Sequence, residues 1–329
     1  MPMHNRRSLI RGGAALSVMA SLGAARLALA DTKAAVRLIV PYPPGAATDT
    51  LGRLMAQALE PAVAAPVIVD NRGGAGTQIG TRAVATAAPD GRTLGFVDTA
   101  FVINPGLFGS ALPYDTEKDF APISLMASAP LVLIVHRGVP AATLTEFVAL
   151  SKAKPGSLNY GSAGVGSAPH LAGEQLRAAA AIDINHVPYR GGGTVLNDLL
   201  AGHVQFGFTT VPTMIDHIRA GTVRALAVTG AQRAAQLPDT PTMQEAGLPS
   251  VDATPIFGLI GPAKLPPDTV SRLSSTAAQA VRAGPLHQKL MELGFVPVGS
   301  TAEEFRTRIR REIEKWAAVV KAGNIKPNA

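Results

Sequence analysis

Pro41-Tyr42-Pro43-Pro44-Gly45-Ala46-Ala47-Thr48-Asp49 lies between an apolar run at residues 36–40 and an amphipathic run at residues 51–59. This order predicts a strand, a rigid turn and the start of a helix. Such a turn presents peptide N–H groups and small hydroxyls at a helix N-terminus, where an anion binds without a metal or a lysine. A second segment of this kind, Gly161-Ser162-Ala163-Gly164-Val165-Gly166-Ser167, also precedes a predicted helix. The two loops predict a ligand held between two lobes.

Short β-like runs alternate with helical runs along the rest of the chain, which is typical of an α/β protein with parallel sheets. The first set predicts strands at 36–40, 67–70 and 93–97 and helices at 49–59 and 77–87. The second predicts strands at 131–135, 158–160, 184–187, 206–208 and 225–228, with helices at 144–152, 168–179, 195–201 and 214–220. A final set predicts a strand at 257–260 and helices at 269–283, 286–293 and 302–321. We therefore expect the chain to leave lobe 1 near residue 131 and to return near residue 255.

The first 30 residues have the features of an export signal. A twin-arginine pattern at residues 5–11 precedes a mild apolar run at 12–25, and Ala28-Leu29-Ala30 gives a cleavage site. We expect a Tat-type signal peptide at 1–30 and a soluble periplasmic protein. The alternative is a disordered basic N-terminus on a cytosolic protein.

Charge and cysteine content exclude several classes of function. The full chain has a net charge of +7, but the leader holds four arginines and no acid, which leaves 26 basic and 23 acidic residues, a net of +3. A charge this small, without a run of basic and aromatic residues, gives no nucleic-acid footprint. The absence of cysteine in the sequence excludes disulfides, thiolate metal sites and a cysteine nucleophile.

Three groups of residues invite a more specific chemistry. Ser162 and Ser167 precede His170 and Glu174, but no nucleophile elbow is present, and the spacing from Ser167 to His170 favours a helix cap with a ligand contact. His170 and Glu174 alone make a weak metal motif. The glycine-rich stretch at 73–80 lacks the dinucleotide spacing and favours a tight turn between a strand and a helix. Two interpretations stay open for residues 191–193: their N–H groups bind a second carboxylate beside Tyr189, which offers a hydroxyl or a stacking face, or the segment is a solvent loop.

At these residues the chain resembles the Bug family, the periplasmic solute receptors of tripartite tricarboxylate transporters. The resemblance covers nearly the whole mature chain and rests on ordered blocks. They include Arg37–Tyr42 with Pro44, Gly45, Thr48 and Asp49; Val69–Gly76; Ala88–Gly91; Ile103–Pro105; Leu112–Asp115; Lys118–Pro122; Leu158–Gly164; His170–Glu174; His186–Tyr189; Ala225–Thr229; Pro241 and Thr242; and Glu245–Pro249.

The resemblance implies a type II periplasmic-binding-protein fold, with two lobes, a hinge and an interlobe cleft that closes on a carboxylate. We expect lobe 1 at 31–130 plus 252–329 and lobe 2 at 131–251. The implied ligand-binding residues are Tyr42, Pro43, Gly45, Ala46, Thr48, Asp49, Thr99, Ala100, Ser162, Ala163, Gly166, Ser167, His170, Tyr189, Gly191, Gly192, Thr209 and Thr210. Many family members carry Asp-Asn where this chain has Thr209-Thr210, so we expect it to disfavour amino acids and to prefer a carboxylate with a neutral or a second anionic distal group.

The predicted function is capture of a small organic carboxylate for cognate membrane transporter subunits by a monomer. No catalytic activity, cofactor, metal or nucleic-acid partner is expected. Two alternatives stay open: a periplasmic sensor for a signalling partner, and a hydrolase of carboxylate esters.

Overall fold

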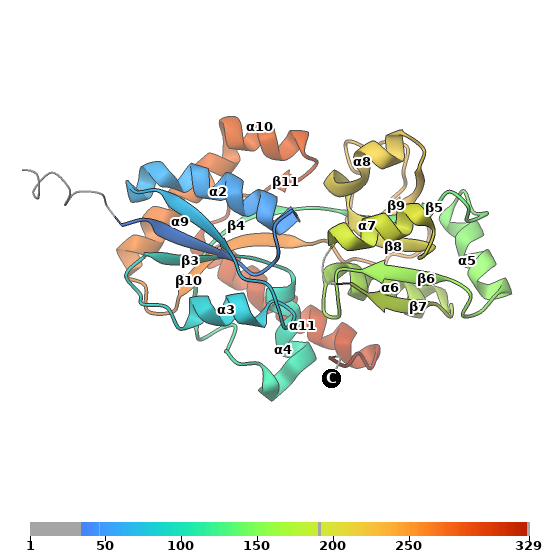
Figure 1. The fold of residues 1–329 in the computed structure, drawn as a ribbon, viewed down its shortest axis with the longest axis horizontal. Helices are drawn as coiled ribbons and strands as arrows, with labels where there is room; N and C mark the ends of the chain where they lie inside the picture. The colour runs from blue at the N-terminus through green and yellow to red at the C-terminus, as the bar shows by residue number, and fades with distance from the viewer. Residues whose placement is uncertain (1–33, 46, 190–191, 328–329) are drawn as a thin grey trace, which may run out of the picture.

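Two β-sheets, each flanked by helices, organise the chain (Figure 1). The computed structural model describes residues 34–45, 47–189 and 192–327. The predicted signal peptide, Ala46 and Gly191 therefore lie outside the described residues. The first sheet has the strand order β11-β4-β10-β3-β1-β2 and the second β7-β6-β8-β5-β9.

We call the first sheet and its helices lobe 1, and the second sheet and its helices lobe 2. The elements of lobe 1 are β1 (Val36–Val40), α2 (Ala47–Val63), β2 (Val67–Asn71), α3 (Gln78–Ala85), β3 (Thr93–Asp98), α4 (Ala100–Phe108), the 3₁₀ turn η1 (Gly109–Ala111), β4 (Phe120–Ser128), β10 (Ile256–Pro262), α9 (Pro267–Arg282), α10 (Pro285–Glu292), β11 (Val296–Pro297) and α11 (Ala302–Ala322). Those of lobe 2 are β5 (Leu131–His136), α5 (Leu144–Ala153), β6 (Asn159–Ser162), α6 (Ala168–Ala180), β7 (Asn185–Pro188), α7 (Gly192–Ala201), β8 (Phe206–Thr210), α8 (Val211–Arg219) and β9 (Val223–Val228).

The strand directions correct one expectation. β1 pairs in parallel with β2 and β3, and β6 pairs in parallel with β7 and β8, as the βαβ pattern predicts. However, β10 runs antiparallel to β3 and β4, and β5 runs antiparallel to β8 and β9. The prediction of parallel sheets is thus wrong for these pairs, because β4, β5, β9 and β10 adjoin the crossings between the sheets rather than a helical crossover within one sheet.

The chain crosses between the lobes in two segments that lie side by side. The Ala129 N–H donates to the Pro255 carbonyl at 3.1 Å, which joins the outgoing segment to the returning one. Thr229 and Leu131 exchange two further hydrogen bonds, one of them through the Thr229 hydroxyl. Figure 1 shows α11 running from beneath lobe 1 toward lobe 2, and it contacts α4 of lobe 1 and α6 of lobe 2.

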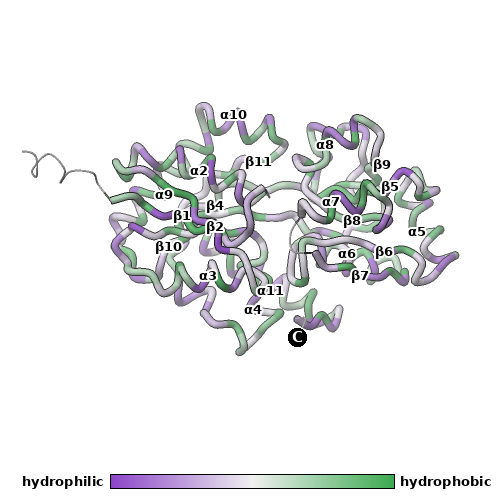
Figure 2. The backbone as a smooth tube through the Cα atoms, in the orientation of Figure 1, coloured by the Kyte–Doolittle hydropathy of each residue, from purple (hydrophilic) through white to green (hydrophobic). Residues whose placement is uncertain are grey.

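The apolar core follows the two sheets, and one cluster of buried side chains continues from lobe 1 into lobe 2. In Figure 2 hydrophilic residues are prominent along α10, on the outside of lobe 1. Trp316 of α11 is fully buried in this core. Within the part of the chain described above, no helix combines the length and the hydrophobicity needed to cross a bilayer.

Candidate functional site between the lobes

The loop after β1 begins at the carboxyl end of that strand and leads into α2. Its acid, Asp49, is buried and accepts hydrogen bonds from the Gly45 N–H, the Asn71 amide and the Arg53 guanidinium. Burial opposes ionisation of Asp49, but these hydrogen bonds outweigh it and hold the pKa of its carboxyl below the ordinary value. The carboxylate of Asp49 therefore fixes the loop from within and stabilises its turn.

Asp98, at the end of β3, organises the same wall and was not singled out from the sequence. Its carboxylate accepts from the Tyr42 hydroxyl at 3.1 Å, from the Thr48 hydroxyl at 3.2 Å and from the Ala100 N–H at 3.0 Å. Burial raises the pKa of Asp98 despite these three donors, and it also raises the pKa of Tyr42 well above its ordinary value. Asp98 thus ties the β1 loop to the start of α4.

The glycine-rich turn between β2 and α3 forms a further part of this wall. Four consecutive residues, Gly74 to Thr77, have positive φ values of 123°, 48°, 60° and 75°. A β-branched residue rarely takes that conformation, so Thr77 marks a constrained backbone. Asn104 of α4 holds the turn by donating to the Gly76 carbonyl at 2.9 Å and to the Thr77 hydroxyl at 3.2 Å. The predicted tight turn is confirmed.

In lobe 2 the opposing wall comes from the turn between β6 and α6. Ser167 caps α6, because its hydroxyl accepts from the His170 N–H and donates to the Gly164 carbonyl. The Nδ1 atom of His170 accepts from the Gly166 N–H at 3.2 Å. The imidazole of His170 therefore stabilises the turn. The hydrogen bond from the His170 N–H to the Ser167 hydroxyl confirms the predicted cap.

Behind this turn, two histidines stack in the interior of lobe 2. The His170 and His186 rings lie 4.0 Å apart between centroids, and Tyr160 stacks on the far side of His186. Burial lowers the pKa of His170 to about 3 and that of His186 to about 4, so both imidazoles are neutral at pH 7. The Ser162 hydroxyl lies 2.6 Å from Nε2 of His186.

A cavity of about 720 Å³ lies between the two lobes, within the size range of small-molecule sites. Both lobes supply its wall, which is made mostly of turns at the carboxyl ends of strands. The described lining residues are Pro41, Tyr42, Pro43, Gly74, Ala75, Gly76, Thr77, Gln78, Ala100, Phe108, Ala163, Gly164, Val165, Gly166, Ser167, Pro188, Tyr189 and Pro327. No Asp, Glu, Lys, Arg or His is among them, so an anion held here depends on N–H, hydroxyl and amide donors.

The structure divides the predicted ligand-binding residues into two groups. Those that line the cavity are Tyr42, Pro43, Ala100, Ala163, Gly166, Ser167 and Tyr189; the described residues outside its wall are Gly45, Thr48, Asp49, Thr99, Ser162, His170, Thr209 and Thr210. Several of the second group have structural partners. The Thr99 hydroxyl accepts from the Ile256 N–H, and the Thr210 hydroxyl bonds Thr213. Thr209 and Ser162 line a much smaller hollow of about 40 Å³ inside lobe 2.

Sequence reasoning missed part of the wall. The turn at residues 74–78 had a usable signal, because its glycines follow the strand beside β1, where the carboxyl ends of parallel strands gather. Phe108 and Pro327 had no such signal, since one ends a helix and the other follows the last helix of the chain.

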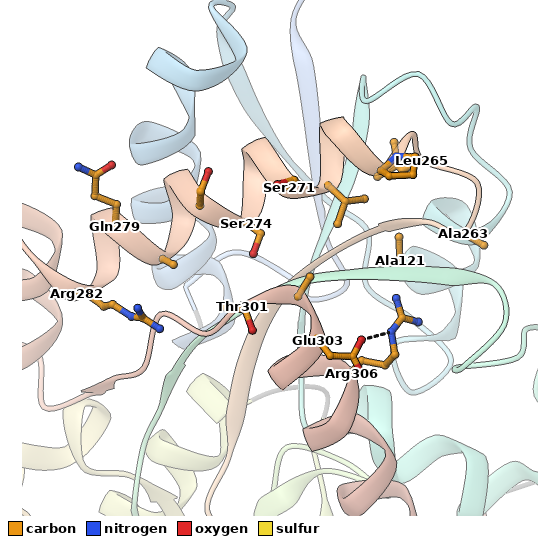
Figure 3. A pocket seen from close by; sticks show the side chains of 15 residues that line it. Ala121, Ala263, Leu265, Ser271, Ser274, Gln279, Arg282, Thr301, Glu303 and Arg306 are labelled. Carbon is orange, nitrogen blue, oxygen red and sulfur yellow. Dashed lines mark ion pairs between the residues drawn. The ribbon is translucent and has the colours of Figure 1, made fainter.

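A second hollow, of about 770 Å³, lies on lobe 1 alone (Figure 3). Its wall comes mainly from α9 and the start of α11, and it includes Ser274, Gln279 and Arg282. The guanidinium of Arg306 is already paired with Glu303 at 3.4 Å. Because this hollow involves one lobe and no strand-end turn facing another lobe, the interlobe cavity is the stronger candidate for a ligand site.

The chain is similar to known solute receptors over most of its length. The family model described as "Tripartite tricarboxylate transporter family receptor" matches residues 51–325. Protein BugT of Bordetella pertussis is 36% identical over 92% of this chain and 94% of its own length. The solved structure of R. palustris Rpa4515 with adipate superposes with a TM-score of 0.85 at 30% identity, covering 91% of this chain and all of that one. MatC from Rhodopseudomonas palustris with bound malate gives 0.81 at 29% identity, covering 87% and 98%.

Proposed function

Because this chain belongs to the tripartite tricarboxylate transporter family of receptors, and so is a solute-binding protein with the α/β two-lobed periplasmic-binding fold, we propose that it captures an organic carboxylate between its lobes. The leader at 1–30 directs export of the protein through the twin-arginine pathway, so that it meets the carboxylate in the periplasm. The closed form is then recognised by membrane transporter subunits. Lobe 1 comprises 31–130 and 252–329, lobe 2 comprises 131–251, and the paired crossings form the hinge.

The observation that carries this proposal is the composition of the cavity wall. Turns at strand ends from both lobes meet across one cavity, and no described lining residue bears a charge. Fixed peptide dipoles and hydroxyls stabilise an anion in such a site, with each charge-assisted hydrogen bond contributing about 1.5–3 kcal/mol. The adipate and malate bound by two related structures support an acid as the ligand.

A thermal-shift panel of mono-, di- and tricarboxylates tests this proposal. A ligand that binds only the native state raises the free energy of unfolding, by about 2.7 kcal/mol when its concentration is about a hundred times Kd, and so raises the melting temperature. We expect at least one acid to raise the Tm by several degrees, and its uncharged amide to leave the Tm unchanged. Equal shifts with acid and amide, or no shift with any acid, would contradict carboxylate capture.

A second candidate function is supported by the close contact between Ser162 and His186. A serine hydroxyl 2.6 Å from an imidazole nitrogen is the pairing that ester hydrolysis uses. However, Ser162 is 1% exposed and lies outside the wall of the main cavity, which favours a structural role. Turnover of a chromogenic carboxylate ester that disappears in Ser162→Ala would support the hydrolase.

A further inference from the structure

Three aromatic rings line the interlobe cavity, although aromatic residues make up only 5% of the chain. Tyr42 follows β1 in lobe 1, Phe108 ends α4 in lobe 1, and Tyr189 follows β7 in lobe 2. Phe108 lies against the glycine turn, because a Cβ atom on Gly76 would be 3.6 Å from its Cζ. Rings therefore reach the cavity from both lobes.

The hydroxyl groups of both tyrosines are already bound to carboxylates. Tyr42 donates to Asp98 at 3.1 Å, and Tyr189 donates to Asp198 at 2.6 Å. Neither acid lines the cavity. Burial and the Asp198 hydrogen bond raise the pKa of Tyr189 to about 12, which keeps the phenol protonated and donating. Each tyrosine therefore leaves its ring, rather than its hydroxyl, for contact with a ligand.

The rest of the wall is also mainly apolar. Besides the rings it presents several prolines and alanines and one valine, and its described residues supply no charge to pair with a second carboxylate or an ammonium group. The polar side chains of the described wall are few, namely Thr77, Gln78 and Ser167 besides the two tyrosines, so a ligand with polar substituents along its body would lose more hydration there than it gains in hydrogen bonds. The described wall thus fits a single anionic group attached to an apolar body.

We propose that the ligand of this receptor is an aromatic monocarboxylate, whose flat body is held between Tyr42 of lobe 1 and Tyr189 of lobe 2. This inference rests on the proposed function, because it assumes that an acid occupies the interlobe cavity. Stacked or edge-to-face contacts between aromatic rings contribute binding free energy in addition to that from burying apolar surface. An aliphatic body of the same size gains only the contribution from burial. The rings thus select for an aryl group among acids of similar size.

Isothermal titration calorimetry of the full chain with matched acids tests the proposal. We expect benzoate to bind roughly fivefold more tightly than cyclohexanecarboxylate, which has the same carboxylate and no π face. Malate, adipate and terephthalate, which add polar or second anionic groups, should bind more weakly than benzoate. Tightest binding by malate, adipate or terephthalate, or equal binding of benzoate and cyclohexanecarboxylate, would overturn the aromatic proposal while leaving carboxylate capture intact.

Variants of Tyr189 separate the ring from the hydroxyl. Tyr189→Phe keeps the ring and releases Asp198, which is partly exposed, so we expect benzoate affinity to change less than twofold. Tyr189→Leu removes the ring and should weaken benzoate about fivefold while barely changing cyclohexanecarboxylate. A large loss in Tyr189→Phe would show that the ligand uses the hydroxyl and would refute the proposal. A failure of every acid to bind the wild-type chain would instead refute the proposed function.

Discussion

At the scale of single residues, most polar groups near the cavity are held by the protein itself. Asp49 and Asp98 each accept several hydrogen bonds, and both tyrosine hydroxyls donate to acids. Gln78, at the start of α3, is different, because its half-buried side chain lines the cavity without a hydrogen bond to any described residue. Its amide is thus available to a ligand.

Replacement of Gln78 by leucine should weaken carboxylate binding about tenfold. The substitution removes an amide donor, and hydrogen bonds to charged groups contribute about 1.5–3 kcal/mol. Calorimetry with the tightest acid measures the change. Gln279→Leu is the matched control, because Gln279 lines the separate hollow on lobe 1 and should leave the affinity unchanged. The opposite pattern would place the ligand in that hollow.

The two stacked histidines predict that stability falls on mild acidification. Their pKa values in the folded protein, about 3 for His170 and about 4 for His186, lie below the ordinary 6.5. The unfolded chain therefore takes up protons first, so the stabilisation is complete above pH 6.5 and is lost as pH falls toward 4. Urea unfolding at pH 7 and pH 5 should show a loss of about 2 kcal/mol or more.

Variants identify the source of that pH dependence. His170→Asn should reduce the loss between pH 7 and pH 5, because one of the two depressed groups is gone. His203→Asn should leave the loss unchanged, since the His203 side chain is 71% exposed. If the three proteins lose stability equally, other groups are responsible.

At the scale of elements, close packing between helices and strands sets the shape of each lobe. Gly173 of α6 lies directly on the ring of Tyr160 in β6, so that a Cβ atom there would overlap the ring. The Tyr160 hydroxyl then donates to Glu174 of the same helix at 2.7 Å, and Arg177 pairs with that acid. The helix that carries the lobe 2 turn is therefore positioned by this contact.

Gly173→Ala should destabilise the protein by about 1–3 kcal/mol. Helix propensity alone would favour alanine by about 1 kcal/mol, but the overlap with Tyr160 costs more. Chemical denaturation measures the difference. In Gly193→Ala the new methyl group on α7 meets no atom within 4 Å, so that variant should be neutral or more stable. A stabilised Gly173→Ala would mean that α6 moves away from β6 at little cost.

Sequence periodicity predicted the elements that alternate or have an amphipathic face. Examples are the predicted helices at 269–283 and 302–321, which the structure confirms as α9 and α11. It missed β4 and α4, because Pro122 and Ser124 interrupt the apolar run of β4, and α4 has no polar face. Part of the cavity wall was found from its loops, whereas Asp98 and Phe108 depend on tertiary packing that no local pattern encodes.

At the scale of the whole molecule, the two lobes touch through small residues. Gly166 of lobe 2 lies so close to α4 of lobe 1 that a Cβ atom would be 2.6 Å from Cδ2 of Leu107. Its φ of +81° also favours glycine. This contact limits how closely the lobes approach.

Gly166→Ala should hold the lobes farther apart and weaken carboxylate binding at least tenfold. The added methyl group must displace Leu107, since a well-packed contact does not yield freely. Small-angle X-ray scattering with and without ligand would show a smaller ligand-induced compaction than in the wild type. Adding Leu107→Ala creates space and should restore part of both effects. No recovery in the double variant would point to backbone strain rather than lobe contact.

The joined crossing segments make lobe 2 a single insertion with its two ends side by side. Since the Ala129 N–H bonds the Pro255 carbonyl, and Ser128 faces Ile256 in the antiparallel pairing, a tight two-residue hairpin could replace residues 130–254. The pairing of the six-stranded sheet would stay unbroken, while half of the cavity wall would be gone. Removing residues 130–254 in this way would leave lobe 1 alone. Folding of lobe 1 could then be measured in a chain that no longer binds a carboxylate between two lobes.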